Sequence, residues 1–144
     1  MHGLLNNAEA RWVKAAVAAA NNTDSNSAII DTSGYESVMF VVPVTASVAT
    51  GVAKIQLEEN DANADAGMTV VDGAVASAVS GTTNDLASKV LVVEYFKPRK
   101  RYVQAVITST VANQTRREMI AILVPLQRPA QQGSTVLAKG SGQG

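Results

Sequence analysis

The amino-acid sequence predicts an all-β fold in which antiparallel strands form a sandwich or a barrel. Several segments alternate apolar and polar residues with a period of two, as a strand with one buried face does, and the clearest is VAKIQLEE at 52–59. Gly, Pro, Asn and Asp separate these segments at short intervals, and no convincing helical pattern lies between them. We therefore expect about seven or eight consecutive strands with short turns. The chain has 144 residues, which predicts one domain with a real core.

The first 20 residues fit two kinds of secondary structure. The Ala-rich segment AEARWVKAAVAAA would propagate a helix well, whereas the alternation around Trp12 also fits a strand. We expect residues 1–20 to form an N-terminal arm, helical or extended, followed by the polar loop NNTDSNS at 21–27.

The segments that follow indicate strands. The segment 35–44 is a long strand, and because both of its faces are apolar we expect it to be central or covered on both sides. Pro43 cannot donate a backbone hydrogen bond, so strand pairing should weaken there. The sandwich domain is expected over 21–129, and the Gly- and Ser-containing segment 130–144 should form a flexible C-terminal tail. The other expected strands are 28–30, 52–59, 68–73, 74–81, 89–96, 101–110 and 117–126.

The composition limits the possible functions. The formal net charge is zero, which favours neither nucleic acid nor a membrane surface as a partner. The absence of Cys excludes disulfides and Cys-ligated metals. No apolar run reaches the length of a membrane span, and the first residues make a poor signal peptide.

The charges are unevenly distributed along the chain. The segment from Asp24 to Asp85 contains nine acidic residues and one basic residue, whereas the segment from Lys89 to Arg128 contains eight basic residues and two acidic ones. Such a chain forms a molecule with two oppositely charged surfaces if the fold separates the halves. If the strands of the halves interleave, the charges cancel, and the sequence leaves both outcomes open.

One acidic segment, DANADAG, resembles a calcium-binding loop. Asp61, Asn63 and Asp65 have the spacing of oxygen ligands in such loops. However, Ala66 occupies the position where the sharp turn needs glycine, and Gly67 comes one residue late. An acidic, solvated loop between strands is therefore the preferred interpretation, and no metal or other cofactor is expected.

No catalytic residues are expected. The only histidine, His2, lies at the terminus, where we do not expect it to act as a general base. The adjacent Glu58 and Glu59 would point to opposite faces of a strand, so they cannot act as a pair. Nothing in the sequence indicates that the chain is an enzyme.

Four segments, taken in order, carry a resemblance to a known family: AIIDTSGYESVMFVVPV, IQLEENDANADAG, KPRKRYVQAVITST and AILVPLQRPA. Together they resemble small structural proteins of tailed bacteriophages, the head decoration or capsid cement proteins, over roughly residues 28 to 130. Gln104 stands where that family commonly has Arg, and the segment 73–86 is longer than expected. The matching positions are Asp31, Gly34, Tyr35, Glu36, Glu58, Asp61, Lys100, Arg101 and Tyr102.

The resemblance implies a β-sandwich of jelly-roll type, bound to the outside of a shell of major capsid protein. It implies a virion location on the outer surface of the capsid, after assembly in the host cytoplasm. On symmetry grounds we expect a homo-oligomer, a dimer first and a trimer second. The alternative is a tail, appendage or carbohydrate-binding module. Such modules usually expose aromatic platforms for sugar rings. This chain has one Trp, and the scarcity of such platforms favours the role of a cement protein.

The candidate residues fall into two groups. The turn before the long strand should set its register: Asp31 should cap the turn, Gly34 should adopt a positive φ, and the hydroxyl of Tyr35, next to Glu36, should face water. The second group should contact the capsid or another subunit. It comprises the basic cluster Lys97, Arg99, Lys100 and Arg101, expected at a hairpin tip facing an acidic surface, and the apolar residues of the termini, Leu4, Leu5, Trp12, Val13, Val136 and Leu137.

Overall fold

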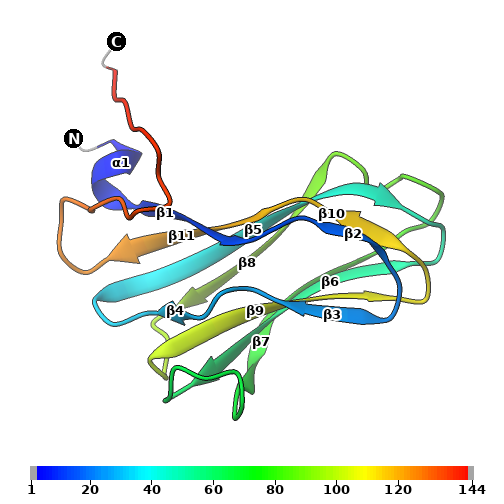
Figure 1. The fold of residues 1–144 in the computed structure, drawn as a ribbon, viewed down its shortest axis with the longest axis horizontal. Helices are drawn as coiled ribbons and strands as arrows, with labels where there is room; N and C mark the ends of the chain where they lie inside the picture. Colours follow the sequence, from blue (N-terminus) through cyan, green and yellow to red (C-terminus); the bar gives the residue numbers. More distant parts are fainter. Residues whose placement is uncertain (1–2, 143–144) are drawn as a thin grey trace.

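Two antiparallel sheets, packed face to face, contain almost all regular structure of the computed structural model, which describes residues 3–142 (Figure 1). Sheet A comprises β1 (Glu9–Lys14), β2 (Val17–Ala20), β5 (Tyr35–Ser47), β8 (Lys89–Phe96), β10 (Gln114–Arg116) and β11 (Met119–Pro125). Sheet B comprises β3 (Thr23–Asn26), β4 (Ile30–Asp31), β6 (Val52–Asn60), β7 (Thr69–Val79) and β9 (Tyr102–Thr110). The one helix among the described residues is α1 (Leu4–Asn7), which is too short to cross a membrane.

The strand order is that of a jelly roll. β1 and β2 pair with β11 and β10, which both pair with β5, and β3 and β4 both pair with β9. Each of these three couples therefore acts as one interrupted strand, which leaves eight strands. Numbered along the chain, they lie in the order 1-8-3-6 in sheet A and 2-7-4-5 in sheet B. Two sheets of four strands with this order are the jelly-roll arrangement, so the predicted fold class is confirmed.

The core lies between the two sheets. From β5 the buried apolar residues are Val38, Phe40, Val42 and Val44, and they meet the buried residues of β6 and β9 in sheet B. The central place predicted for the long strand is confirmed, because β8 pairs with one edge of β5 and β10 and β11 with the other. Pairing is irregular close to Pro43, where the chain opposite is interrupted between β10 and β11.

The beginning of the chain differs from the expected arm. Residues 9–20 form the edge strands β1 and β2, and Val13 is buried in the core. The Ala-rich segment becomes extended because its alternating residues complete sheet A beside β11 and β10. The sandwich therefore begins at Glu9, before the expected boundary at residue 21. His2 lies outside the described residues.

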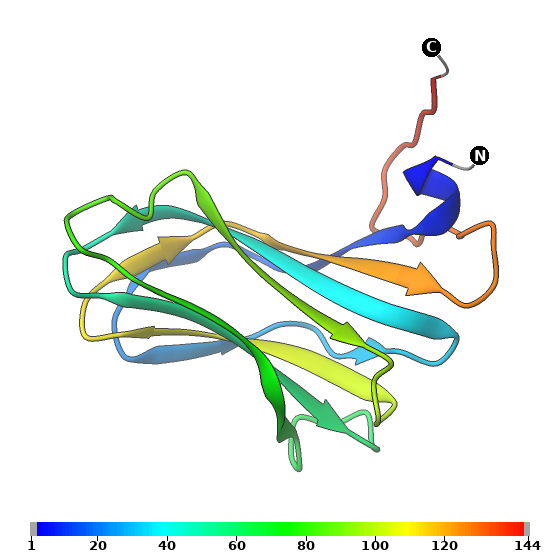
Figure 2. The same cartoon turned by 180° about the vertical axis from the view of Figure 1, so that it is seen from behind.

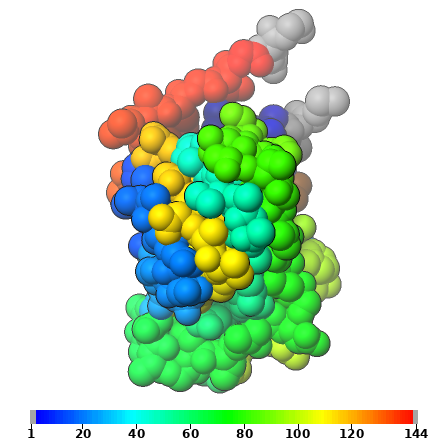
Figure 3. All heavy atoms as spheres, turned by 90° about the vertical axis from the view of Figure 1, so that its right-hand side faces the viewer, coloured from blue at the N-terminus to red at the C-terminus, as the bar shows by residue number. Residues whose placement is uncertain are grey.

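Two further expectations are changed by the structure. The segments 68–73 and 74–81 form one strand, β7, which bends where Gly73 has a φ of +75° and the register with β6 shifts. After β11 the described chain has no regular structure, and it leaves the body beside α1 as an extended segment (Figures 1 and 3).

Candidate functional site

The outer face of sheet A is apolar across four adjacent strands, and we name it the apolar face. Its side chains are in register from β1 through β11 and β5 to β8. One row comprises Trp12, Ile120, Val41 and Val92, and the neighbouring row comprises Ala10, Ile122, Met39 and Glu94. Val124, Ser37 and Phe96 form a third row, and Pro43 and Val90 pair beyond the first.

The outer face of sheet B is mixed, because polar residues lie beside the exposed Val70, Val75 and Val79 of β7. Along β6 the outward residues include Lys54, Gln56 and Glu58, and the neighbouring β9 contributes Gln104 and Thr108. Antiparallel sheets commonly bury one face and solvate the other, as sheet B does. Sheet A therefore departs from the pattern expected for a sandwich surrounded by water on all sides.

The edge strand β8 shows how open the apolar face is. Val90 and Phe96 are more than half exposed, and Val92 is 43% exposed. Figure 2 shows β8 beside β7 at the neighbouring edges of the two sheets. Monomeric proteins rarely leave so large a contiguous apolar surface in water, so this face has the character of an interaction surface.

A second candidate region is the end of the sandwich from which both termini leave. Gln132 of the tail accepts a hydrogen bond from the Ala10 backbone and donates to the carbonyl groups of Leu5 and Ala8. The Thr135 hydroxyl accepts from the Trp12 backbone at 3.3 Å. These contacts cover the open edge of β1 and connect the two ends of the described chain.

The apolar residues predicted as contacts in the termini differ in exposure. Leu4 and Leu137 are 83% and 103% exposed, and Trp12 is about half exposed. Leu5 and Val136 are partly buried. The prediction for Val13 is wrong, because its side chain points into the core from β1.

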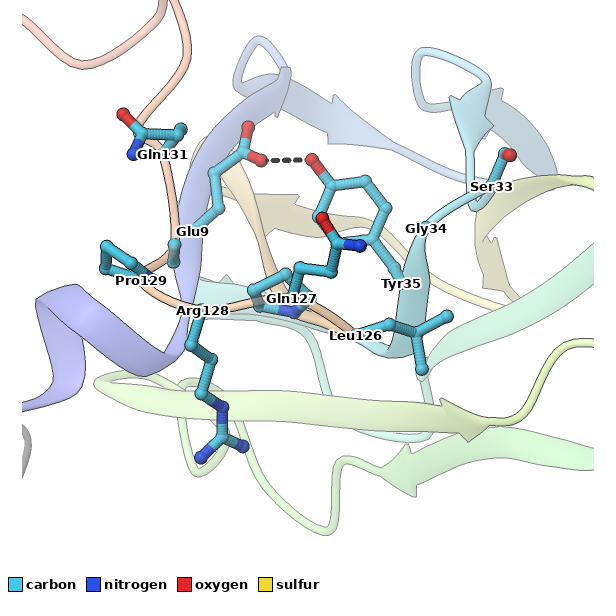
Figure 4. Close-up of a pocket in the computed structure, with 11 residues that line it drawn as sticks. Glu9, Ser33, Gly34, Tyr35, Leu126, Gln127, Arg128, Pro129 and Gln131 are labelled. Atoms are coloured by element: carbon cyan, nitrogen blue, oxygen red, sulfur yellow. Dashed lines mark hydrogen bonds between the residues drawn. The ribbon is translucent and has the colours of Figure 1, made fainter.

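An open pocket of 540 Å³ lies at this end, between the turn that precedes β5 and the segment 125–131 at the end of β11 (Figure 4). Its wall includes the buried carboxylate of Glu9. This carboxylate accepts a hydrogen bond from the Tyr35 hydroxyl and forms an ion pair with Arg11 at 2.7 Å. Gly133 passes so close that an added Cβ atom would lie 3.0 Å from Glu9 Oε1. The Glu9 carboxylate is thus held by Tyr35 and Arg11 within the fold.

The turn before β5 has the predicted geometry at two of its residues. Asp31 Oδ1 accepts a hydrogen bond from the Ser33 backbone, and Gly34 has a φ of +85°. Arg101 also donates to both carboxylate oxygens of Asp31, and this hydrogen bonding lowers the Asp31 pKa. Glu36 accepts a backbone hydrogen bond from Lys97. The expectation that the Tyr35 hydroxyl faces water is wrong, and burial followed by the bond to Glu9 raises the Tyr35 pKa.

This correction changes the expected effect of Tyr35→Phe. Removing the hydroxyl leaves the buried carboxylate of Glu9 without one of its donors, so we expect a loss of about 1–3 kcal/mol in the free energy of unfolding. The control is Tyr102→Phe, since the Tyr102 hydroxyl is partly exposed and has no hydrogen bond within residues 3–142. Urea denaturation of both variants measures the difference, and equal stabilities would contradict the assigned role of the hydroxyl.

The basic cluster is a crossover between the sheets, so the expected hairpin tip is wrong. It connects β8 of sheet A to β9 of sheet B, and its charges are engaged within the molecule. Arg101 pairs with Asp31, and Arg99 pairs with the buried Glu59. Lys100 Nζ donates to Thr69, and the Lys97 ammonium lies 5.1 Å from the centre of the Phe96 ring. The acidic and basic halves of the sequence therefore interleave in this region.

In the acidic loop 60–67, one of the three residues with the spacing of calcium ligands has a structural role. Asp65 accepts hydrogen bonds from Asn26 and Gln104, which ties the loop to β3 and β9. Asn60 closes the loop through three bonds to its backbone. Within residues 3–142 no group of three or more His, Asp or Glu side chains is arranged to hold a metal ion.

Two polar residues in the interior were missed by the sequence analysis. Gln114 and Arg116 point inward from β10 and are fully buried. Among the described residues neither the Gln114 amide nor the Arg116 guanidinium has a hydrogen-bond partner, and burial lowers the Arg116 pKa. Both residues belong to the short polar segment QTR, and a polar segment is normally expected to face water. The sequence therefore does not indicate that they are buried.

Comparisons with known proteins support the fold. Models of protein families and curated proteins give no match to this chain. Among solved structures, the PBSX exported protein XepA superposes with a TM-score of 0.57 and 13% identity over 99% of this chain, which spans 46% of that protein. A structure of Bacillus endospore appendages, described as disulfide-linked pili, gives a TM-score of 0.45 and 16% identity over 85% of this chain and 91% of that one. At these identities the likeness to XepA shows a shared fold.

Proposed function

We propose that the chain is a structural subunit of a phage particle, and that it binds the outside of the capsid and holds neighbouring major capsid protein subunits together. The observation that carries the first part of this proposal, a subunit of an assembly, is the apolar face, because a sheet face with one charged residue across four strands is suited to a protein interface. The resemblance of four segments to capsid cement proteins supports it, as does the shared fold with an exported protein of PBSX. In this role the chain has no catalytic activity.

The contact with the shell is assigned to the terminal end. Leu4 and Leu137 extend into solvent from the α1–tail region, and their burial against a shell would remove apolar area from water at about 25 cal/mol per Å². The basic crossover has a smaller part than the sequence suggested, since Arg99 and Arg101 are already paired. Both side chains of the Arg101–Asp31 pair are exposed, so solvent screens that pair.

The alternative, a sugar-binding module of a tail or appendage, has weaker support. The exposed aromatic residues of the apolar face are Trp12 on β1 and Phe96 on β8. With strands about 4.8 Å apart, three strand spacings separate these edges by about 14 Å, which is too far for both rings to stack on one sugar.

Truncation after Thr135 tests the shell contact, because it removes Val136 and Leu137 and keeps the bonds of Gln132 and Thr135. We expect an unchanged thermal transition and a several-fold lower occupancy on phage particles purified from the strain that encodes the chain. The matched control is Val48→Ser, an exposed apolar residue in the loop after β5, which should leave occupancy unchanged.

Imaging of the same particles locates the chain. Many copies on an icosahedral shell would support the cement role, whereas copies confined to a tail or fibre would support the alternative. Particles without the chain would overturn the proposed function.

A further inference from the structure

We propose that the apolar face is covered by a second copy of this chain, so that the functional unit is a twofold-symmetric dimer with the two apolar faces packed together. This inference rests on the proposed structural function and names the partner of that face. The terminal end then remains free for the shell.

The size of the face agrees with a dimer interface. The thirteen outward residues of the face lie about 4.8 Å apart across the strands and about 6.8 Å apart along them, so they cover about 420 Å² of projected area. Two such faces together cover about 850 Å², and the relief of the side chains brings the area removed from water towards the roughly 1,000 Å² of a weak specific interface. Buried area alone does not set the affinity of such a dimer, so its dissociation constant has to be measured.

The chemistry of the face is self-complementary. In a twofold interface the same surface meets itself, so a charged face would repel its copy, whereas an apolar one fits. The row through Val41 and Ile120 is apolar from edge to edge. Glu94 is the one charged side chain in the four rows, and it lies on the edge strand β8.

The position of Glu94 selects the direction of the twofold axis. An axis across the strands would lay β8 over β8 and bring two carboxylates together, which is unfavourable between like charges. An axis along the strands lays β8 of one copy over β1 of the other, so the two Glu94 side chains lie at opposite edges. In that arrangement the row end at Trp12 faces the row end at Val92 of the other copy.

The test uses Trp12 as a reporter, because it is the single tryptophan of the chain and lies in the face. Analytical ultracentrifugation and Trp12 fluorescence are followed together over a range of protein concentrations. For the parent chain we expect a monomer–dimer equilibrium, with Trp12 emission shifting to shorter wavelength as the dimer forms. Val92→Lys should raise the dimer dissociation constant at least about tenfold, because it places an unpaired charge in the interface.

The matched control is Val75→Lys. Val75 and Val92 are both 43% exposed, and both point outward from edge strands, but Val75 belongs to sheet B. We expect less than about a twofold change in the dissociation constant for Val75→Lys. If Val92→Lys fails to fold, Val41→Thr takes its place in the test, because it keeps the side-chain shape at the centre of the face. We expect Val41→Thr to raise the dimer dissociation constant several-fold.

Several results would overturn the proposal: a parent chain that stays monomeric, a trimer, or equal weakening by Val92→Lys and Val75→Lys. A shift of Trp12 emission on adding zwitterionic lipid vesicles to the monomer would assign the face to lipid and overturn it as well. A monomeric chain that still occupies particles would refute the dimer alone. A dimer absent from particles would refute the proposed function alone.

Discussion

Replacing Arg116 with methionine should increase the free energy of unfolding by about 2–4 kcal/mol. The guanidinium of Arg116 is fully buried and has no hydrogen-bond partner among the described residues. Its transfer from water is therefore uncompensated, and burial lowers its pKa for the same reason. Methionine is unbranched and fills irregular interior space without a charge to desolvate.

The neighbouring arginine supplies the control. Arg117 is largely exposed and pairs with Glu118 at 3.2 Å, so Arg117→Met should change stability by less than about 0.5 kcal/mol. Urea denaturation of both variants at neutral pH measures the two effects. A destabilised Arg116→Met variant would show that the guanidinium is satisfied inside the fold, for example by buried water.

The Arg116→Met variant also bears on assembly. Keeping the unpaired guanidinium of Arg116 in β10 lowers the stability of the fold. In addition, β10 pairs with β2 through two residues only. If the more stable variant still forms the dimer and occupies particles as the parent does, Arg116 has no part in assembly. If it loses either property, the buried arginine contributes to that interface at a cost in monomer stability.

Strands β5, β6, β8, β9 and β11 could be predicted because their alternation is clean, as in β6, where Ile55 and Leu57 are buried and Lys54 and Gln56 are outward. The short β10 was not among the expected strands, and β7 was expected as two strands. β1 and β2 could not be assigned, because a run of alanines satisfies a helical and an extended pattern equally. The pairing of Ala20 with Gln114 decides between them, and this contact joins residues far apart in the sequence.

The apolar face could be predicted in part. The sequence showed that both faces of 35–44 are apolar, but either burial or an interface satisfies that pattern. The decision needs the neighbours of β5, and the register places Ile120 and Val92 on either side of Val41. The signal in EMIAILVPL was present, since Ile120, Ile122 and Val124 alternate with the buried Met119, Ala121 and Leu123.

The buried charged residues could not be predicted from the sequence. Glu9 and Glu59 are each 3% exposed, although a glutamate in an alternating segment usually indicates the solvent face. Their partners, Tyr35 for Glu9 and Tyr95 for Glu59, come from strands distant in the sequence. Only the three-dimensional arrangement joins each acid to its hydroxyl donor.

Glu59 gives the second large effect, since Glu59→Leu should lower the free energy of unfolding by about 3 kcal/mol or more. The Glu59 carboxylate accepts hydrogen bonds from the Tyr95 hydroxyl at 2.7 Å and from the Lys100 backbone at 3.2 Å, and it pairs with Arg99. Leucine leaves both donors without an acceptor at the crossover between the two sheets. The loss should therefore be cooperative and detected by every probe of unfolding.

The adjacent Glu58 is the matched control, because it has the same side chain on the opposite face of β6. Desolvation, together with the nearby Asp65 and Asp24, raises the Glu58 pKa, so its charged form is less favourable in the folded state. The stability of the parent should therefore fall slightly as pH rises from below the unfolded pKa through the raised folded value, and Glu58→Leu should remove that dependence. At neutral pH we expect Glu58→Leu to remain within about 0.5 kcal/mol of the parent. Equal losses in the two variants, measured by urea denaturation, would show that Glu59 does not organise the crossover.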